Sequence, residues 1–246
     1  LLNAWAFYDW ANSVYTLTIA STIFPIFYSA LFLDKVKQIH FFGFEIKSTA
    51  LISFVTAFTF FVISVLSPIL SGIADYIGNK KLFLKFFCYL GSFGCIGLYW
   101  FSLEHIYTSM FLYFCGLIGY WGSLVFYNSY LPDIAYPEQQ DKISAKGFSI
   151  GYVGSVILLV FNLAMVMYPN WFGFTGTESE AALTAMRISF ITVGVWWMLF
   201  AQYSFYYLPK GNAQEKKEVK DILFNGFKEL QLVWNQLKEN LRLKRF

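Results

Sequence analysis

Charge is scarce in this chain of 246 residues. Asp, Glu, Lys and Arg together make up 13% of it, whereas hydrophobic residues make up 57%. Soluble domains carry about 25% charged residues. The shortage excludes an ordinary soluble domain and indicates a protein that resides in the lipid bilayer.

Cysteine and histidine are rarer still. The three cysteines, Cys88, Cys95 and Cys115, form no C-x-x-C pair, and His40 and His105 stand far apart in the sequence. These spacings predict neither a disulfide framework nor a metal site. The chain also lacks a nucleotide-binding loop and a nucleophile elbow, so we expect no cofactor and no enzymatic activity.

Six stretches contain no charged residue and approach or exceed the roughly 20 residues needed to cross a bilayer. They cover residues 14–33, 48–74, 86–103, 106–132, 147–177 and 188–209. Lipid offers no hydrogen-bond partner to an open strand edge, so these spans must be helices. The sequence therefore predicts an all-α membrane protein with six transmembrane helices.

The basic residues favour one orientation. With both termini in the cytoplasm, fourteen Lys and Arg residues lie inside and four lie outside, which agrees with the positive-inside rule. The net charge of +3 follows from this bias and gives no reason to expect a nucleic acid partner. Fifteen Lys against three Arg is compatible with an AT-rich genome and favours a bacterial inner membrane.

Composition divides the chain into a membrane bundle over residues 1–209 and a basic segment over residues 210–246. In the second part apolar residues recur every three or four positions with lysines on the other faces, which predicts an amphipathic helix. Such a helix lies on the anionic inner leaflet or packs on another cytoplasmic segment, and both interpretations stay open.

The loop between the second and third stretches reads SGIADYIGNKK, residues 71–81. It resembles the signature loop of the major facilitator superfamily, a Gly-x-x-x-Asp-Arg-x-Gly-Arg-Arg-Arg-like pattern. Asp75 stands at the acidic position, Gly78 at the second glycine, and Lys80 and Lys81 in the basic run. The resemblance predicts that these four residues form a conformational gate loop.

Two positions depart from that pattern, since Tyr76 replaces an Arg and Asn79 replaces the first basic residue. A physical argument stands beside the resemblance. Asp75 can meet the N-terminal dipole of a neighbouring helix, Gly78 permits a positive φ, and the two lysines anchor the turn at the inner surface. The alternative is a plain positive-inside loop with a solvated aspartate.

Two further motifs sharpen the resemblance, YDWANSVY at residues 8–15 and YNSYLPDIAYPEQQDKISAKGFSIGYVGS at residues 127–155. With the loop, they are similar to the vacuole-effluxer-like branch of the superfamily, over nearly the whole chain up to the sixth stretch. The resemblance implies a proton-linked or facilitative carrier that rocks two six-helix halves around a central cavity. Some members of that branch are thought to export amino acids from vacuoles.

The architecture that the resemblance implies has twelve spans, and this chain has six. We therefore expect the N-terminal half of a carrier, with a half-size carrier that dimerises as the alternative.

Small residues allow another helix to approach closely. Those of the second and fifth spans are expected to face the second half: Ser53, Ala57, Ser64, Ser67, Ser71, Gly147, Gly151, Gly154 and Ser155. A comparable face in the third span weakens this argument: Gly91, Gly94 and Gly97.

Six spans with both ends on one side can divide into a 3+3 inverted repeat. Two short polar clusters at corresponding positions of the two halves are weak evidence for such a repeat, because clusters this short also arise by chance. They are Tyr8, Asn12 and Ser13 near the cytoplasmic end of the first span, and Tyr127, Asn128 and Ser129 near that of the fourth.

Asp9 is a charged residue that lies close to the first apolar stretch, where the membrane-like composition gives no reason to expect a carboxylate. On a helix it shares a face with Asn12, Ser13 and Thr16, a polar stripe that points away from lipid. A charge near the bilayer centre costs at least about 2.5 kcal/mol on insertion scales, so such residues usually face a cavity or a partner. We expect Asp9, with Tyr8 and Asn12, to line the cytoplasmic end of a translocation path.

Two other interpretations of Asp9 stay open. Burial favours the neutral form of a carboxylate, which makes Asp9 a candidate for proton coupling. Alternatively, Trp5, Tyr8 and Trp10 mark the membrane interface, and Asp9 lies among the headgroups or caps the helix.

Three more polar residues lie inside the spans. Asn128 and Asn162 are candidates for hydrogen bonds to substrate, although interhelical bonds of about 0.6 kcal/mol are the commoner use. Arg187 would attract an anion or, more commonly, snorkel to the interface. The superfamily often carries a basic residue in the fourth span, but residues 106–131 hold none, which makes simple facilitated efflux more plausible.

The sequence thus predicts a membrane transporter for a small polar organic solute, with amino-acid efflux among the activities that the resemblance implies. Its expected partners are the solute, the lipid bilayer and a second six-helix half. A non-transporting scaffold or assembly subunit is the alternative, and the polar stripe of the first span argues against it.

Overall fold

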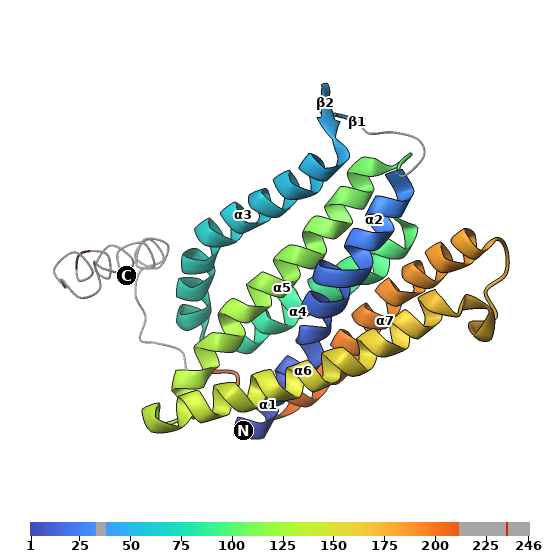
Figure 1. Cartoon of the computed structure of the whole chain (residues 1–246). Helices are drawn as coiled ribbons and strands as arrows, with labels where there is room; N and C mark the ends of the chain where they lie inside the picture. The colour runs from blue at the N-terminus through green and yellow to red at the C-terminus, as the bar shows by residue number, and fades with distance from the viewer. Residues whose placement is uncertain (33–37, 212–234, 236–246) are drawn as a thin grey trace.

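Long helices dominate the structure (Figure 1). The computed structural model describes residues 1–32, 38–211 and 235, except for the side chains of residues 72 and 75–77. Six helices of this part are long and apolar enough to cross a membrane: Leu2–Phe32, Ser48–Ser71, Lys80–Trp100, Ile106–Ile134, Pro137–Met167 and Glu178–Tyr207. The prediction of six long apolar helices is confirmed. The amphipathic helix predicted for residues 210–246 lies almost wholly outside the described residues.

The first span is one continuous helix with an unusual middle. It consists of α1 (Leu2–Val14), the π-helical segment η1 (Tyr15–Ile23) and α2 (Phe24–Phe32). It therefore begins twelve residues before the charge-free stretch and includes Asp9. Pro25 explains part of the π geometry, because it has no N–H and its ring crowds the carbonyl four residues earlier. The turns before it widen, and the amide of Phe24 donates to the carbonyl of Ile19.

The other spans are α3 (Ser48–Ile77), α4 (Lys80–Gly97) with the 3₁₀ turn η2 (Leu98–Trp100), α5 (Ile106–Ile134), α6 (Pro137–Met167) and α7 (Glu178–Tyr207). Pro68 lies inside α3, and Figure 1 shows this helix changing direction along its length. A proline in a helix interior removes one backbone hydrogen bond and kinks the helix.

The ends of α6 and α7 differ from the prediction by about ten residues. Residues 168–177 carry no charge, but they form the 3₁₀ turn η3 (Pro169–Phe172) and a loop in which Gly173 and Gly176 take positive φ. Helix α7 begins earlier than expected, where Thr177 and Glu180 form a capping box. Absence of charge therefore marked the apolar segment but not the helix boundaries.

The helices have a common end that carries the N-terminus, the α3–α4 and α5–α6 turns and the end of α7 (Figure 1). The Ser204 hydroxyl joins α7 to α1 there by donating to the carbonyl of Ala4 over 2.7 Å. Helix α3 stands to one side, mainly against α5. Only 11% of its most apolar stretch is buried, against 67% for α5, so α3 keeps most of its surface for lipid or another partner.

A small β-hairpin lies at the opposite end of the bundle (Figure 1). Strands β1 (Gln38–Phe41) and β2 (Phe44–Lys47) pair antiparallel, with Gln38 opposite Lys47. The prediction of purely helical structure missed this element. Its turn places both Phe42 and Gly43 at positive φ.

Glycines bring helices together inside this bundle. A Cβ at Gly94 of α4 would lie 2.6 Å from the backbone nitrogen of Gly116 in α5. On α6, a Cβ at Gly151 would lie 2.6 Å from Ser13 Oγ, and one at Gly154 would lie 2.9 Å from the Trp10 ring. The prediction that the α6 glycines face a second half is wrong, because α1 already covers them.

Candidate functional site

Asp9 lies inside the protein, in the second half of α1. Its side chain is 5% exposed, and the Tyr127 hydroxyl donates to its Oδ2 over 2.9 Å. Burying an unpaired carboxylate costs on the order of several kcal/mol. Tyr127 belongs to α5, so a distant segment of the chain supplies the donor that makes Asp9 tolerable there.

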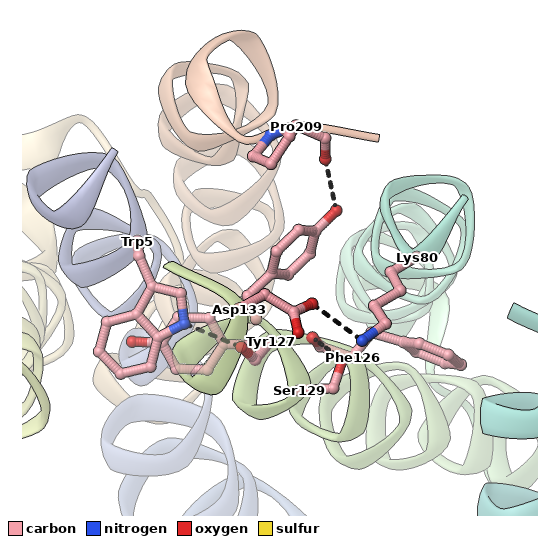
Figure 2. A network of polar contacts seen from close by, with 8 residues as sticks. Trp5, Lys80, Phe126, Tyr127, Ser129, Asp133 and Pro209 are labelled. Atoms are coloured by element: carbon pink, nitrogen blue, oxygen red, sulfur yellow. Dashed lines mark hydrogen bonds and ion pairs between the residues drawn. The ribbon is translucent and has the colours of Figure 1, made fainter. Parts of the chain in front are cut away.

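Aromatic side chains hold Tyr127 in place. The rings of Trp5 and Tyr127 are stacked with centroids 4.3 Å apart, and Trp5 Nε1 donates to the Tyr127 carbonyl over 2.8 Å (Figure 2). The Tyr8 ring lies 5.1 Å from that of Tyr127. Trp5 and Tyr8 are 2% and 0% exposed. Both side chains therefore build the α1–α5 contact, and the alternative in which Trp5, Tyr8 and Trp10 mark the membrane interface stays a prediction.

The backbone of α6 closes the third side of this carboxylate. A Cβ at Gly147 would lie 2.5 Å from Asp9 Oδ2 and 3.2 Å from the Tyr127 hydroxyl. A Cβ at Gly151 would lie 3.0 Å from the Asp9 carbonyl. Asp9 therefore sits where α1, α5 and α6 meet, and the glycines leave just enough room for it.

A hollow of about 340 Å³ opens beside this junction. Its lining comes from the first, fourth and fifth spans: Ser13, Thr16, Leu17, Ser21, Tyr120, Phe148, Tyr152 and Ser155. Ser13 is one helical turn from Asp9, and Ser13 and Thr16 belong to the polar stripe that the sequence predicts. Pockets for small molecules typically measure about 300–1,000 Å³, so the hollow is large enough for a small solute.

The hollow is lined mainly by hydroxyl groups and aromatic rings. Three hydroxyls already donate to the protein: Ser13 to Asn12 Oδ1 over 3.4 Å, Thr16 to the Ser13 carbonyl over 2.9 Å, and Ser155 to the Gly151 carbonyl over 2.7 Å. One wall belongs to the π-helical segment η1, and such segments often occur at functional sites.

None of the residues predicted for the path is among those that line the hollow. Tyr8 and Asn12 are fully buried on α1. Asn162 is also buried, and its Oδ1 accepts from Thr192 Oγ1 over 2.9 Å, which joins α6 to α7. Asn128 is exposed on α5. The structure thus brings Tyr8 and Asp9 together at Tyr127 and places Asn162 in an interhelical bond; a role of any of these residues in a path stays a prediction.

The loop with the signature pattern is the α3–α4 turn, which lies at the end of the bundle that carries the N-terminus (Figure 1). Gly78 ends α3 with φ 66°, which confirms the positive φ predicted there. Lys80 Nζ pairs with Asp133 Oδ2 of α5 over 3.0 Å (Figure 2), and Lys81 Nζ donates to the Leu208 carbonyl over 2.6 Å. The side chain of Asp75 lies outside the described part, and the gating role of the loop stays a prediction.

A further bond ties down the chain that leaves α7. The Tyr130 hydroxyl donates to the Pro209 carbonyl over 2.8 Å (Figure 2). With Lys81 on Leu208, two consecutive carbonyls at the exit of the sixth span are bound by α5 and α4. Lys81 of the signature pattern is therefore hydrogen-bonded to the first residue after α7.

Arg187 is not among the residues that line the hollow. Its guanidinium donates to the Tyr99 carbonyl and stands 5.0 Å from the centroid of the Phe27 ring. The half-buried Arg187 is therefore engaged by α2 and by the turn η2 that follows α4.

Sequence reasoning missed most of the lining. On α6, Phe148, Tyr152 and Ser155 follow at steps of four and three, which places them on one helical face; this spacing beside the glycines was the available signal. Tyr120 had no such signal, because it lies in an almost uniformly apolar stretch. Within the described ranges, no three His, Cys, Asp or Glu side chains are grouped to hold a metal ion.

Known proteins resemble the chain throughout its length. The family model described as vacuole effluxer Atg22 like matches residues 1–246. The chain is 30% identical over 243 residues to the uncharacterized MFS-type transporter YxiO of Bacillus subtilis (strain 168), covering 96% of this chain and 53% of that protein. It is 28% identical over 177 residues to an uncharacterized protein of Aquifex aeolicus (strain VF5), covering 70% and 41%. The chain spans about half the length of these relatives, and no solved structure gives a significant match.

Proposed function

The chain belongs to the vacuole effluxer Atg22-like family of MFS-type membrane proteins, and from this premise we propose that it carries a small polar organic solute across the bilayer by alternating access. The single observation that supports this most is the hollow. Ser13, Thr16, Ser21 and Ser155 bring hydroxyl groups from two spans to one hollow, and a few polar groups in a largely apolar pocket are what fix a small ligand. Amino-acid efflux is one activity of this kind.

We propose that the hollow is completed by a second six-helix half. The six helices would form a 3+3 inverted repeat, and binding at the interface of two such units is common among secondary transporters. Phe148 and Tyr152 line the hollow yet are 61% and 68% exposed, which fits a wall whose opposite side comes from elsewhere. The second half would belong to the same chain or to a second copy. The denatured mass of the purified native protein separates the two cases.

The proposed location is a bacterial inner membrane with both termini in the cytoplasm, where the Lys-rich loops and the signature loop would lie. Asp9 would be a coupling group at the cytoplasmic end of the path. In liposomes, Asp9→Asn should abolish uptake driven by a pH gradient, whereas Glu104→Gln, an exposed carboxylate change in a loop, should leave it intact. Unchanged coupling in Asp9→Asn would remove the proton role but leave facilitated transport standing.

Water access to the hollow tests transport directly. A cysteine at Thr16 should react with a membrane-impermeant thiol reagent, from both faces of the membrane when the protein cycles between states. A cysteine at Phe93, which is 59% exposed on α4, is the control and should react slowly because lipid covers it. A Thr16→Cys protein that reacts from neither face would indicate a scaffold and contradict the proposal.

A further inference from the structure

Lysines gather where α4 begins and α7 ends. Lys81 has Lys85 and Lys210 as its like-charged neighbours; Lys85 follows it by one turn on α4, and Lys210 follows the end of α7. The ion pair described at this end of the bundle joins Lys80 to Asp133 of α5 and includes none of these three lysines. Like charges this close disfavour one another, so the cluster is suited to an anion.

Contacts with α7 hold two of these lysines without neutralising them. Lys81 Nζ donates to the Leu208 carbonyl over 2.6 Å, and Lys85 Nζ lies 5.4 Å from the centroid of the Phe205 ring. A ring face attracts an ammonium group, but neither a ring nor a carbonyl carries a full negative charge. An ammonium group has three hydrogens to donate, so Lys81 keeps donors for a further acceptor.

The neutral polar groups of the same helix contact are already paired. Tyr89, one turn beyond Lys85, donates its hydroxyl hydrogen to Gln202 Oε1 over 3.1 Å, and Gln202 Nε2 donates to the Met198 carbonyl over 2.6 Å. Among the described residues, positive charge is therefore what this side of the α4–α7 contact leaves unmatched.

Apolar side chains run beside the lysines on α4. Leu82 and Phe86 each directly follow a lysine in the sequence, and they are 54% and 57% exposed. Because they are four residues apart, they form a row on the helix surface next to the row of lysines. A ligand that combines an anionic group with hydrocarbon chains matches both rows, whereas a soluble anion matches the lysines alone.

The lysines also lie at the depth of lipid headgroups. Helix α4 and its 3₁₀ turn form one membrane span, Lys80–Trp100, and Lys81 and Lys85 are about 6 Å apart along its axis, at about 1.5 Å per residue. The polar layer on each side of a bilayer is about 5–7 Å thick. Tyr206 and Tyr207, at the end of α7, are both exposed, and tyrosines are enriched at that level of the membrane.

We propose that the three lysines bind the phosphate of an anionic phospholipid, whose acyl chains lie along Leu82 and Phe86. Basic pockets between transmembrane helices bind lipid headgroups of this kind. Free phosphate shares the anionic chemistry, but the apolar row and the depth of the lysines favour the lipid. This site goes beyond the proposed transport function and does not depend on it.

Native mass spectrometry of the purified protein in detergent tests this assignment, because it counts the lipids that stay bound. One probe is dioleoylphosphatidylglycerol, which carries a net negative charge. The other is dioleoylphosphatidylcholine, which has the same acyl chains and a phosphate but no net charge. Phosphatidylglycerol should bind at least about tenfold more tightly, since several lysines face its phosphate. Excess inorganic phosphate should not displace it.

Charge variants locate the site. Lys85→Gln and Lys81→Gln should each weaken phosphatidylglycerol binding about fivefold, whereas Lys85→Arg keeps the charge and should stay within about twofold of the unmodified protein. Lys142→Gln is the matched control, because it removes the same charge from an exposed position of α6. Salt screens such a distant exposed charge, so the affinity should change by less than about twofold. If Lys85→Gln fails to fold, Lys81→Gln makes the same measurement.

Three results would overturn the assignment. Equal binding of the two lipids would show that the negative charge is not recognised. An equal loss in Lys142→Gln and in the two α4 variants would replace a defined site by general attraction to a basic surface. Displacement by inorganic phosphate would assign the cluster to a soluble anion. A selective loss in Lys81→Gln and Lys85→Gln, with binding retained in Lys85→Arg, would support the lipid site.

Discussion

Helix α6 presents two faces that differ sharply. On one face, Gly147, Gly151 and Gly154 touch α1 so closely that a single added carbon would collide with it. On the other, Tyr152 and Val160 are 68% and 60% exposed. Small residues on this helix thus mark a contact already made within the half, and large residues mark the surface left for lipid or a second half.

The largest effect should come from filling the glycine face. Gly151→Leu would push a side chain into Ser13 Oγ and the backbone of α1, so α1 and α6 could not both keep their positions. Overpacking in a tight contact typically costs about 1–3 kcal/mol and occasionally more, and the backbone clash here favours about 3 kcal/mol or greater. Unfolding of the purified protein in mixed micelles with rising SDS would measure this loss.

The matched control lies on the same helix. Ser149→Leu adds a side chain of the same size at an exposed position of α6, and it should leave the unfolding midpoint nearly unchanged. Equal destabilisation by both substitutions would mean that the two faces of α6 do not differ in the way described here.

The next effect concerns the carboxylate beneath the glycines. Tyr127→Phe removes the donor to Asp9 Oδ2 and leaves a buried charge with one hydrogen bond fewer, which should cost about 1.5–3 kcal/mol. Combining it with Asp9→Asn should restore part of the loss, since the neutral amide needs the donor less. Additive single effects in this double-mutant cycle would show that the 2.9 Å contact contributes nothing.

A smaller effect is expected at the common end of the helices. The Lys80–Asp133 pair is partly open to water, with side chains 18% and 50% exposed. Such exposed pairs contribute about 0.2–1 kcal/mol. A cycle of Lys80→Ala and Asp133→Ala should give a coupling energy in that range that shrinks at high salt; a coupling that is independent of salt would contradict a screened surface pair.

The smallest effect should come from the open face of α6. Val160→Ala removes two methyl groups from a side chain that is 60% exposed, and surface substitutions usually change stability by less than about 0.5 kcal/mol. If the same substitution lowers solute flux or the yield of an assembled complex without lowering stability, the open face is a binding surface. A loss as large as that of Gly151→Leu would show that this face is packed as tightly as the glycine face.

The sequence predicted the spans well because each physical signal for them is local. Lipid forbids unpaired backbone and charge, so charge-free stretches found all six helices. The same signal misplaced the ends of α6 and α7, because residues 168–177 are apolar but contain Pro169, Gly173 and Gly176, while α7 opens on two glutamates. Helix boundaries follow capping and turn geometry, and here the Thr177–Glu180 capping box was the better guide.

The candidate site was predicted in part. Asp9, Ser13 and Thr16 share a helical face, and the structure keeps them near one another beside the hollow. The periodicity of the sequence shows which residues share a helical face, but it does not show which other helix that face contacts. Tyr127 is 118 residues from Asp9, and nothing in either local pattern pairs them. The glycines of α6 were recognised as a close-packing surface, but their partner was α1 of the same bundle and not a second half.

The π-helical segment of the first span has an evolutionary corollary. Turns closed by hydrogen bonds from residue i to residue i+5 hold an additional residue compared with α-helical turns. Deleting one residue within Tyr15–Ile23 could be absorbed by a return to ordinary helical winding, with Asp9 on one side and Phe27 on the other keeping their directions. A deletion in α1 or α2 would instead rotate everything beyond it by about a quarter of a turn, since α-helices have 3.6 residues per turn. Homologous chains should therefore tolerate single-residue length differences in this segment of the span and nowhere else in it.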